Sequence, residues 1–158
     1  MCSYCGCEAE PVIEELMADH ADISDMAYRI LGAVERGDSR TAERVLVEVA
    51  DRFARHSEME EAGLFAQLRA TGEAVEEVER LTGDHRRFRT ELRQPGLVRR
   101  PAELRALLMD LTVHAETEDD DLFPFAIQVL PALQWDSLNA RFDDPVSSED
   151  SSAGARVR

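Results

Sequence analysis

The chain contains few aromatic residues and no long apolar run. Aromatic side chains make up 6% of its 158 residues, whereas a sheet protein typically draws on aromatic and β-branched residues. Ala, Leu, Val, Glu and Arg are frequent instead, a palette suited to helices. No stretch approaches the roughly 18 apolar residues that span a membrane, and the N-terminus lacks the basic and apolar regions of a secretion signal. The composition therefore predicts an all-α, cytoplasmic protein that does not bind membranes.

Basic residues are also scarce. The chain has 18 basic and 33 acidic side chains, which gives a net charge of -15. Such a surface repels nucleic acid and anionic lipid, so neither is an expected partner. One basic stretch interrupts the acidity and is interpreted as a solvated helix face or as a docking site for an acidic protein whose identity stays open: Arg86, Arg87, Arg89, Arg93, Arg99 and Arg100.

The three cysteines, Cys2, Cys5 and Cys7, are confined to an N-terminal segment, residues 1–8. An odd number of cysteines crowded at one end cannot form a disulfide framework. They could act as a redox relay, a metal contact or a partner contact, or be an unliganded terminus. Residues 143–158 are rich in Ser and Asp, contain hardly any apolar residues, and are predicted to form a disordered tail. One domain of 9–142 remains between these ends.

Four long segments show the three- and four-residue apolar spacing of amphipathic helices. Short breaks separate them, so they predict an up-down-up-down four-helix bundle. Pro124 is expected to kink or end the last long helix, and a short fifth helix is expected to cap the bundle. The predicted helices run over residues 11–37, 39–70, 71–93, 101–124 and 131–142.

The only four histidines of the chain each fall within a different long helix, on its apolar stripe: His20, His56, His85 and His114. At 1.5 Å per residue, the distances to the intervening turns place the first three at nearly one height, and the fourth within about half a turn of them. Two histidines are followed four residues later by a carboxylate on the same helix face, Glu60 and Glu118.

Buried acids beside imidazoles indicate a metal site. An uncompensated buried carboxylate costs several kcal/mol, and a cation between the acids and the imidazoles would offset that cost. Six candidate ligands exceed what one tetrahedral zinc uses, and the mixture of nitrogen and oxygen ligands favours iron. The economical arrangement is two metals bridged by carboxylates. The alternative is a bundle that simply contains His–Glu hydrogen bonds.

The pattern H, H-x-x-x-E, H, H-x-x-x-E, followed by the segment HAETEDDDLFPF, resembles the hemerythrin-like (HHE cation-binding) family of non-haem di-iron bundles over about residues 11–130. The resemblance implies two iron ions joined by an oxo or hydroxo bridge. The four histidines would be terminal ligands, and Glu60 and Glu118 would bridge the metals. Glu118 is preferred to Asp119 because it lies on the stripe; Asp119 remains a substitute and Glu61 an extra ligand.

One departure from the family pattern decides the expected activity. Oxygen-carrying members have a second histidine four residues after the one on the third helix, and here that residue is Arg89. Fewer ligands leave more open positions, which favours chemistry on a bound oxidant. Some bacterial members decompose hydrogen peroxide like a catalase, so the resemblance implies a reaction with peroxide, O2 or NO in oxidative stress. The alternatives are a non-catalytic sensor or store of O2, NO or iron, and a structural zinc or helical interaction protein.

Overall fold

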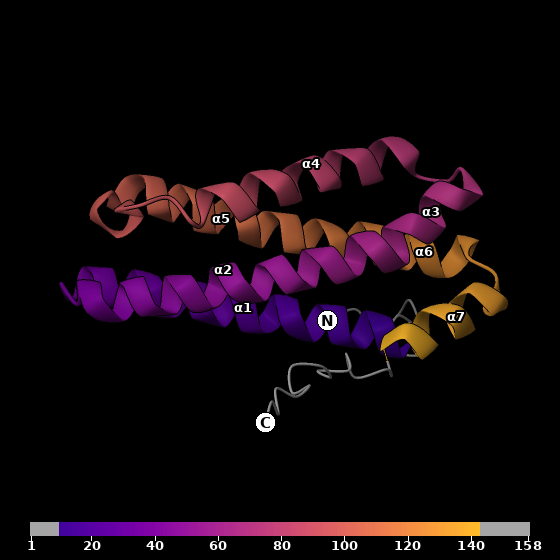
Figure 1. The fold of residues 1–158 in the computed structure, drawn as a ribbon, viewed down its shortest axis with the longest axis horizontal. Coiled ribbons are helices and arrows are strands. Elements are labelled where there is room, and N and C mark those ends of the chain that lie inside the picture. The colour runs from indigo at the N-terminus through magenta and orange to yellow at the C-terminus, as the bar shows by residue number, and fades with distance from the viewer. Residues whose placement is uncertain (1–9, 143–158) are drawn as a thin grey trace, which may run out of the picture.

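The computed structural model describes residues 10–142, and within this range all regular structure is helical. Four rods lie side by side and alternate in direction: α1, then α2 continued by η2 and α3, then α4, then α5 continued by η4 and α6 (Figure 1). The loops after α1 and α4 lie at one end, and α7 packs at the other (Figure 1). The predicted all-α bundle with a short C-terminal helix is confirmed; the cysteine segment and the predicted tail lie outside the described residues. The elements are α1 Pro11–Glu35, α2 Ser39–Glu60, η2 Glu61–Phe65, α3 Ala66–Thr71, α4 Val75–Glu91, η3 Leu97–Arg99, α5 Pro101–Thr117, η4 Glu118–Leu122, α6 Phe123–Val129 and α7 Ala132–Phe142.

Local chemistry explains where the helices begin and end. Pro11 and Pro101 stand in the first turns of α1 and α5, where a missing N–H costs nothing. Asp38 caps α2 by accepting a hydrogen bond from the Thr41 backbone N–H at 3.0 Å. The third long helix begins at Val75, four residues later than predicted, because a turn with left-handed backbone at Gly72 (φ 76°) and Ala74 (φ 50°) intervenes.

Two π-helical turns interrupt the second and fourth rods immediately beside the H-x-x-x-E motifs. η2 begins at the residue after Glu60, and η4 begins at Glu118 itself. Of the two outcomes expected at Pro124, a kink or an end, the end was wrong, since the helix continues as α6 to Val129. In the π turn, the Phe123 N–H donates to the carbonyl of Glu118 five residues earlier. Pro124 then falls in the first turn of α6, where it is tolerated.

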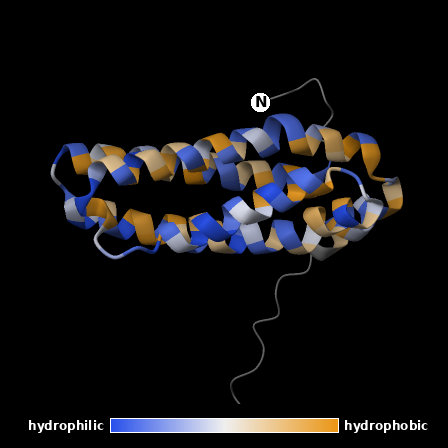
Figure 2. Ribbon diagram, turned by 90° about the horizontal axis from the view of Figure 1, so that it is seen from above, coloured by the Kyte–Doolittle hydropathy of each residue, from blue (hydrophilic) through white to orange (hydrophobic). Residues whose placement is uncertain are grey.

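The apolar core consists of two clusters separated along the bundle. One contains Phe53, Phe88 and Leu111 and lies toward the α1–α2 and α4–α5 loops. The other contains Leu16 and Leu64, with residues of α6 and α7. Figure 2 shows polar and apolar residues alternating around each helix, and within 10–142 no helix is both long and apolar enough to cross a membrane. The predicted polar residues occupy the level between the two clusters.

Candidate metal centre

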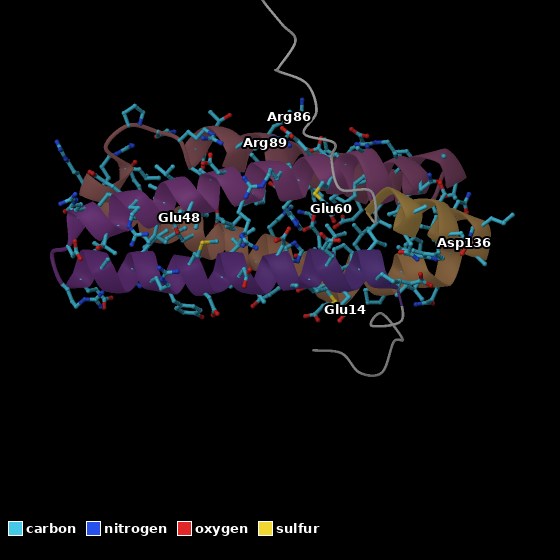
Figure 3. The ribbon with its side chains drawn as sticks, turned by 60° about the horizontal axis from the view of Figure 1, so that its bottom comes forward. Glu14, Glu48, Glu60, Arg86, Arg89 and Asp136 are labelled. Carbon is cyan, nitrogen blue, oxygen red and sulfur yellow. The ribbon has the colours of Figure 1, made fainter. Side chains whose placement is uncertain are left out.

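Six polar side chains form one buried level of the bundle, called here the histidine layer. None of the six is more than 5% exposed, and Figure 3 shows Glu60 in the interior between the rods. All four rods contribute, including the one that carries His114, whose height the residue count left uncertain by half a turn. The members are His20 from α1, His56 and Glu60 from α2, His85 from α4, His114 from α5 and Glu118 from η4.

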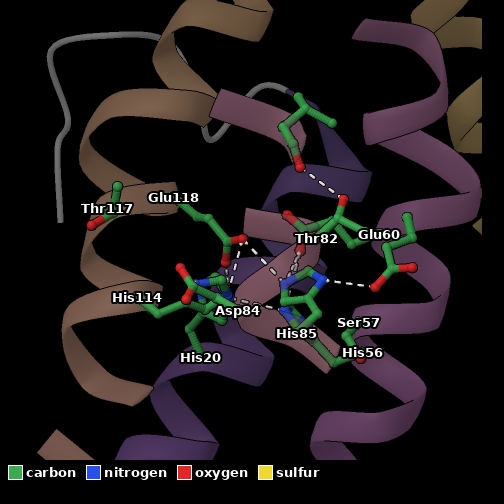
Figure 4. A network of polar contacts seen from close by, with 12 residues as sticks. His20, His56, Ser57, Glu60, Thr82, Asp84, His85, His114, Thr117 and Glu118 are labelled. Atoms are coloured by element: carbon green, nitrogen blue, oxygen red, sulfur yellow. Dashed lines mark hydrogen bonds and ion pairs between the residues drawn. The ribbon is translucent and has the colours of Figure 1, made fainter. Parts of the chain in front are cut away.

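Three of the four imidazoles place Nε2 within 3.3 Å of a Glu118 oxygen, in the network drawn in Figure 4. Glu118 Oε2 lies 3.3 Å from His20 Nε2. Its Oε1 lies 3.3 Å from His85 Nε2 and 3.2 Å from His114 Nε2. His20 Nε2 and His56 Nε2 are 2.9 Å apart. Two groups of candidate ligand atoms result, each spanning less than 4.8 Å, and both contain Glu118.

Glu60 contacts one histidine of each group. Its Oε2 lies 3.8 Å from His56 Nε2 and 3.5 Å from His85 Nε2. Neither oxygen of this fully buried carboxylate has a hydrogen-bond partner. Glu60 is therefore placed, like Glu118, where one carboxylate can serve both groups.

The outer Nδ1 atoms of the four imidazoles each face a carboxylate from another rod. Such a carboxylate fixes the tautomer and the orientation of a metal-bound imidazole. The pairs follow one another around the bundle. A carboxylate of α1 faces the histidine of α2, one of η2 faces that of α4, one of α4 faces that of α5, and one of η4 faces that of α1. The Oδ or Oε to Nδ1 distances are Asp19–His56 3.6 Å, Glu61–His85 3.0 Å, Asp84–His114 3.9 Å and Asp119–His20 2.7 Å.

The four carboxylates that face the Nδ1 atoms are called here the outer ring. Asp119 and Glu61, the predicted substitute and extra ligands, both belong to it. Each hydrogen-bonds to an Nδ1 atom, and each side chain is 25% exposed, whereas Glu118 is fully buried beside the Nε2 atoms. The geometry places them behind the imidazoles. Sequence reasoning missed Asp19 and Asp84, although each directly precedes a layer histidine, because a single helix does not reveal which neighbouring rod its side chain reaches.

Arg89, the residue at the position of a fifth histidine, supports the outer ring. Its Nη1 donates to Ser57 Oγ at 2.9 Å and pairs with Glu61 Oε1 at 3.0 Å. The same Glu61 oxygen faces His85 Nδ1. The guanidinium is thus held on the outer side of His85 and is not a member of either candidate ligand group.

Phenylalanine rings enclose the layer even though aromatic residues are scarce. Phe65 stacks on His85 with ring centroids 5.4 Å apart, and Phe123 stacks on His20 at 5.9 Å. Phe53 contacts the rings of three layer histidines, and Phe88 contacts His114. Four of the six phenylalanines are therefore used to surround the imidazoles with apolar surface and to exclude water.

Burial and neighbouring charges act in opposite directions on the pKa values of several residues in the histidine layer. Burial alone would lower the pKa of His20, but its contacts with Asp119 and Glu118 outweigh burial and raise that pKa to about 10. Burial lowers the pKa of His56. Burial and the nearby charge of Glu118 raise the pKa of Glu60 well above its ordinary value. Burial would likewise raise the pKa of Glu118, yet the surrounding imidazoles hold it well below its usual range.

The donor set fits a bound cation. Buried atoms without a hydrogen-bond partner include both oxygens of Glu60 and Glu118, His85 Nε2 and His114 Nε2. Unpaired buried polar atoms are costly, and these converge on two small volumes. Imidazole nitrogens bound to one ion at about 2.1 Å and a right angle to each other lie about 3 Å apart, close to the 2.9 Å between His20 and His56.

Metal uptake should release protons. His20 has a pKa of about 10, so it is protonated in the metal-free protein at pH 8, whereas a metal ligand must be a neutral imidazole. Calorimetric titration of Zn2+ at about pH 8, in two buffers of different ionisation enthalpy, should report release of at least about one proton per chain. A value near zero would contradict the charged state assigned to His20.

Comparison with known proteins gives one family. The model of the hemerythrin HHE cation binding domain matches residues 12–126, a range that contains the entire histidine layer and its outer ring. No curated protein and no solved structure matches the chain.

Proposed function

The chain belongs to the hemerythrin HHE cation-binding domain family, and from this membership we propose that it binds two iron ions and decomposes hydrogen peroxide. The family membership and the two candidate ligand groups support a metal-binding protein. Two ions, iron and peroxide as the oxidant are our proposal. The mixture of imidazole and carboxylate ligands favours iron over metals that prefer sulfur alone or oxygen alone.

The observation that carries the proposal is the sharing of Glu118 between two groups of only two imidazoles each. Four nitrogens and two carboxylates leave two octahedral ions short of ligands, even when both carboxylates bridge. Arg89 is engaged with Ser57 and Glu61 and adds no nitrogen. Open positions favour binding and conversion of a small oxidant.

The proposed reaction balances without another reductant. Two hydrogen peroxide molecules give one O2 and two H2O, because one peroxide loses two electrons and two protons and the other accepts them. Bound iron would supply the redox-active centre that stores these electrons between the two half-reactions. The reaction therefore requires no electron donor from another protein.

The side chains of the chain itself have separate roles in this proposal. The Nε2 atoms and the two buried glutamates would hold the metals, with His20 and His56 in one group and His85 and His114 in the other. The outer carboxylates fix the imidazole orientations. The phenylalanine rings keep bulk water away from the layer, which strengthens electrostatic interactions within it.

A stoichiometry and turnover measurement tests the proposal. The iron-loaded protein should contain about two irons per chain and evolve one O2 per two peroxides consumed, as followed with an oxygen electrode. His56→Ala should lose one metal and at least about 100-fold in turnover because one group loses a ligand.

The matched control is Arg55→Ala, at the exposed neighbouring position, which should retain both metals and full turnover. Iron-loaded protein that binds O2 or NO without consuming peroxide would replace the proposal by a non-catalytic sensor or store. A protein that takes up only zinc would indicate a structural role.

A further inference from the structure

A pocket of about 590 Å³ lies between α1 and α5 and ends at the histidine layer. Met17, Ala18 and Ala21 of α1 and Ala115 of α5 form much of its wall. Its lining also includes one layer residue, His20, with the carboxylate behind it, Asp119.

We propose that this pocket is the entrance through which a small neutral oxidant reaches the metals, on the His20 side of the layer. The inference rests on the proposed function for the identity of the oxidant. The molecule enters by one route and belongs to one charge class.

The exposure of the histidines restricts the route to two sides. His56 and His85 are 0% exposed, whereas His20 is 4% and His114 is 5% exposed. Each of the latter two lines a pocket. The choice therefore lies between the pocket at His20 and the pocket at His114.

Ion pairs occupy the His114 side. Its pocket has about 270 Å³, and two arginines and two aspartates line it together with Phe88 and Val113. Arg80 pairs with Asp84 at 3.2 Å, and Arg87 pairs with Asp110 at 3.1 Å. A molecule that enters there has to pass between charged groups that already satisfy one another.

The His20 side has no arginine–carboxylate pair at its inner end. Three of the four outer carboxylates pair with an arginine: Asp19 with Arg52 at 2.8 Å, Glu61 with Arg89 at 3.0 Å and Asp84 with Arg80 at 3.2 Å. Among the described residues, Asp119 forms an ion pair only with His20. The pocket consequently reaches the layer past one carboxylate and small apolar side chains.

The lining indicates which molecules pass. Alanine methyls and Met17 suit an uncharged molecule, and the hydroxyls of Ser24 and Thr112 can hydrogen-bond to peroxide. Glu14, Glu116 and Asp119 make the lining acidic, so anions are repelled. Hydrogen peroxide, O2 and NO meet both conditions, whereas superoxide and azide do not.

Blocking the pocket tests the inference. Ala21 is exposed on α1, so Ala21→Trp places an indole over the pocket without repacking the core. In the iron-loaded protein this substitution should slow NO association, measured by stopped flow, by about tenfold or more at unchanged iron content. The matched control is Val113→Trp, at a 59% exposed position beside the His114 pocket, which should change the rate by less than about twofold.

A second readout does not require iron. In the metal-free protein, dissolved O2, which is neutral and paramagnetic, should broaden the NMR methyl signal of Ala115, and Ala21→Trp should abolish that broadening. An anionic paramagnetic probe should not broaden the signal. An unchanged NO rate in Ala21→Trp, or a larger effect of Val113→Trp, would overturn the inference. Peroxide turnover is measured separately, so a wild-type protein that binds NO through this pocket but does not consume peroxide would contradict only the proposed function.

Discussion

Glu118→Gln should remove both of the proposed metal ions at once, whereas any single histidine substitution should remove one. Glu118 Oε2 faces His20, and Oε1 faces His85 and His114, so one carboxylate belongs to both candidate ligand groups. The amide of glutamine has the same shape but carries no negative charge and can offer only one oxygen to a cation. Both groups then lose one anionic ligand, while each keeps its imidazoles and its contact with Glu60.

The expected effect is a more than 100-fold weaker affinity at each site, about 2.8 kcal/mol or more per ion. Substitution of a residue that only orients a ligand already costs about 10- to 100-fold, and a shared ligand should cost more. Metal per chain after dialysis, with affinities from competition against a chelator, measures the loss.

Asp120→Asn is the matched control, since Asp120 lies on the same π-helical turn but is exposed. It should retain both ions. Circular dichroism of the metal-free Glu118→Gln protein should show the helical content of the wild type, so that metal loss is not caused by unfolding. Loss of one ion only would assign Glu118 to a single metal and leave the bridging role to Glu60.

The helical period predicted the inward members of the site and little else about it. Apolar spacing placed all four histidines, Glu60 and Glu118 on stripes, and the structure brings all six together. The period of one helix fixes which face a residue occupies but not which neighbour it meets. For this reason the sequence separated Glu118 from Asp119 by the stripe, yet it could not foresee that Asp119 reaches His20 across the bundle.

The π-helical turns were not predictable from spacing either. A π turn contains one extra residue, so it shifts the following residues by one position around the helix axis. The three- and four-residue spacing of the apolar residues is compatible with this shift and therefore does not reveal it. In the fourth rod the turn carries the chain past Pro124, a residue that usually ends a helix. One signal of this π turn was present in the sequence: apolar residues continue to Val129, beyond the proline at position 124.

Glu60→Met should make the metal-free protein more stable while it weakens metal binding at the proposed dinuclear site. Both oxygens of Glu60 are buried without a hydrogen-bond partner, which is favourable only when a cation lies beside them. Methionine fills a similar volume with apolar atoms. Replacement of buried charged groups by well-packed apolar ones commonly stabilises by about 1–4 kcal/mol, so we expect a gain of about 1–3 kcal/mol in the free energy of unfolding, or a few °C in Tm.

The gain should depend on pH with a definite sign. The pKa of Glu60 is raised in the folded protein by burial and by the charge of Glu118, so above its ordinary value the folded state binds more protons than the unfolded state. The contribution of Glu60 to wild-type stability therefore falls as pH rises from about 4.5 through the raised pKa. Glu60→Met lacks this group, and its advantage in urea unfolding with a chelator present should grow over the same range.

Glu58→Met, at an exposed position on the same helix, should change the metal-free stability by less than about 0.5 kcal/mol. With metal added, the order should reverse, because binding to the folded state adds to wild-type stability by mass action and Glu60→Met has lost a ligand for both ions. A metal-free Glu60→Met protein less stable than the wild type would mean that the carboxylate is satisfied without a cation. Glu60 should therefore destabilise the metal-free protein and stabilise the metal-bound one. A reversal on metal addition would link this buried acid to the ions that we propose it holds.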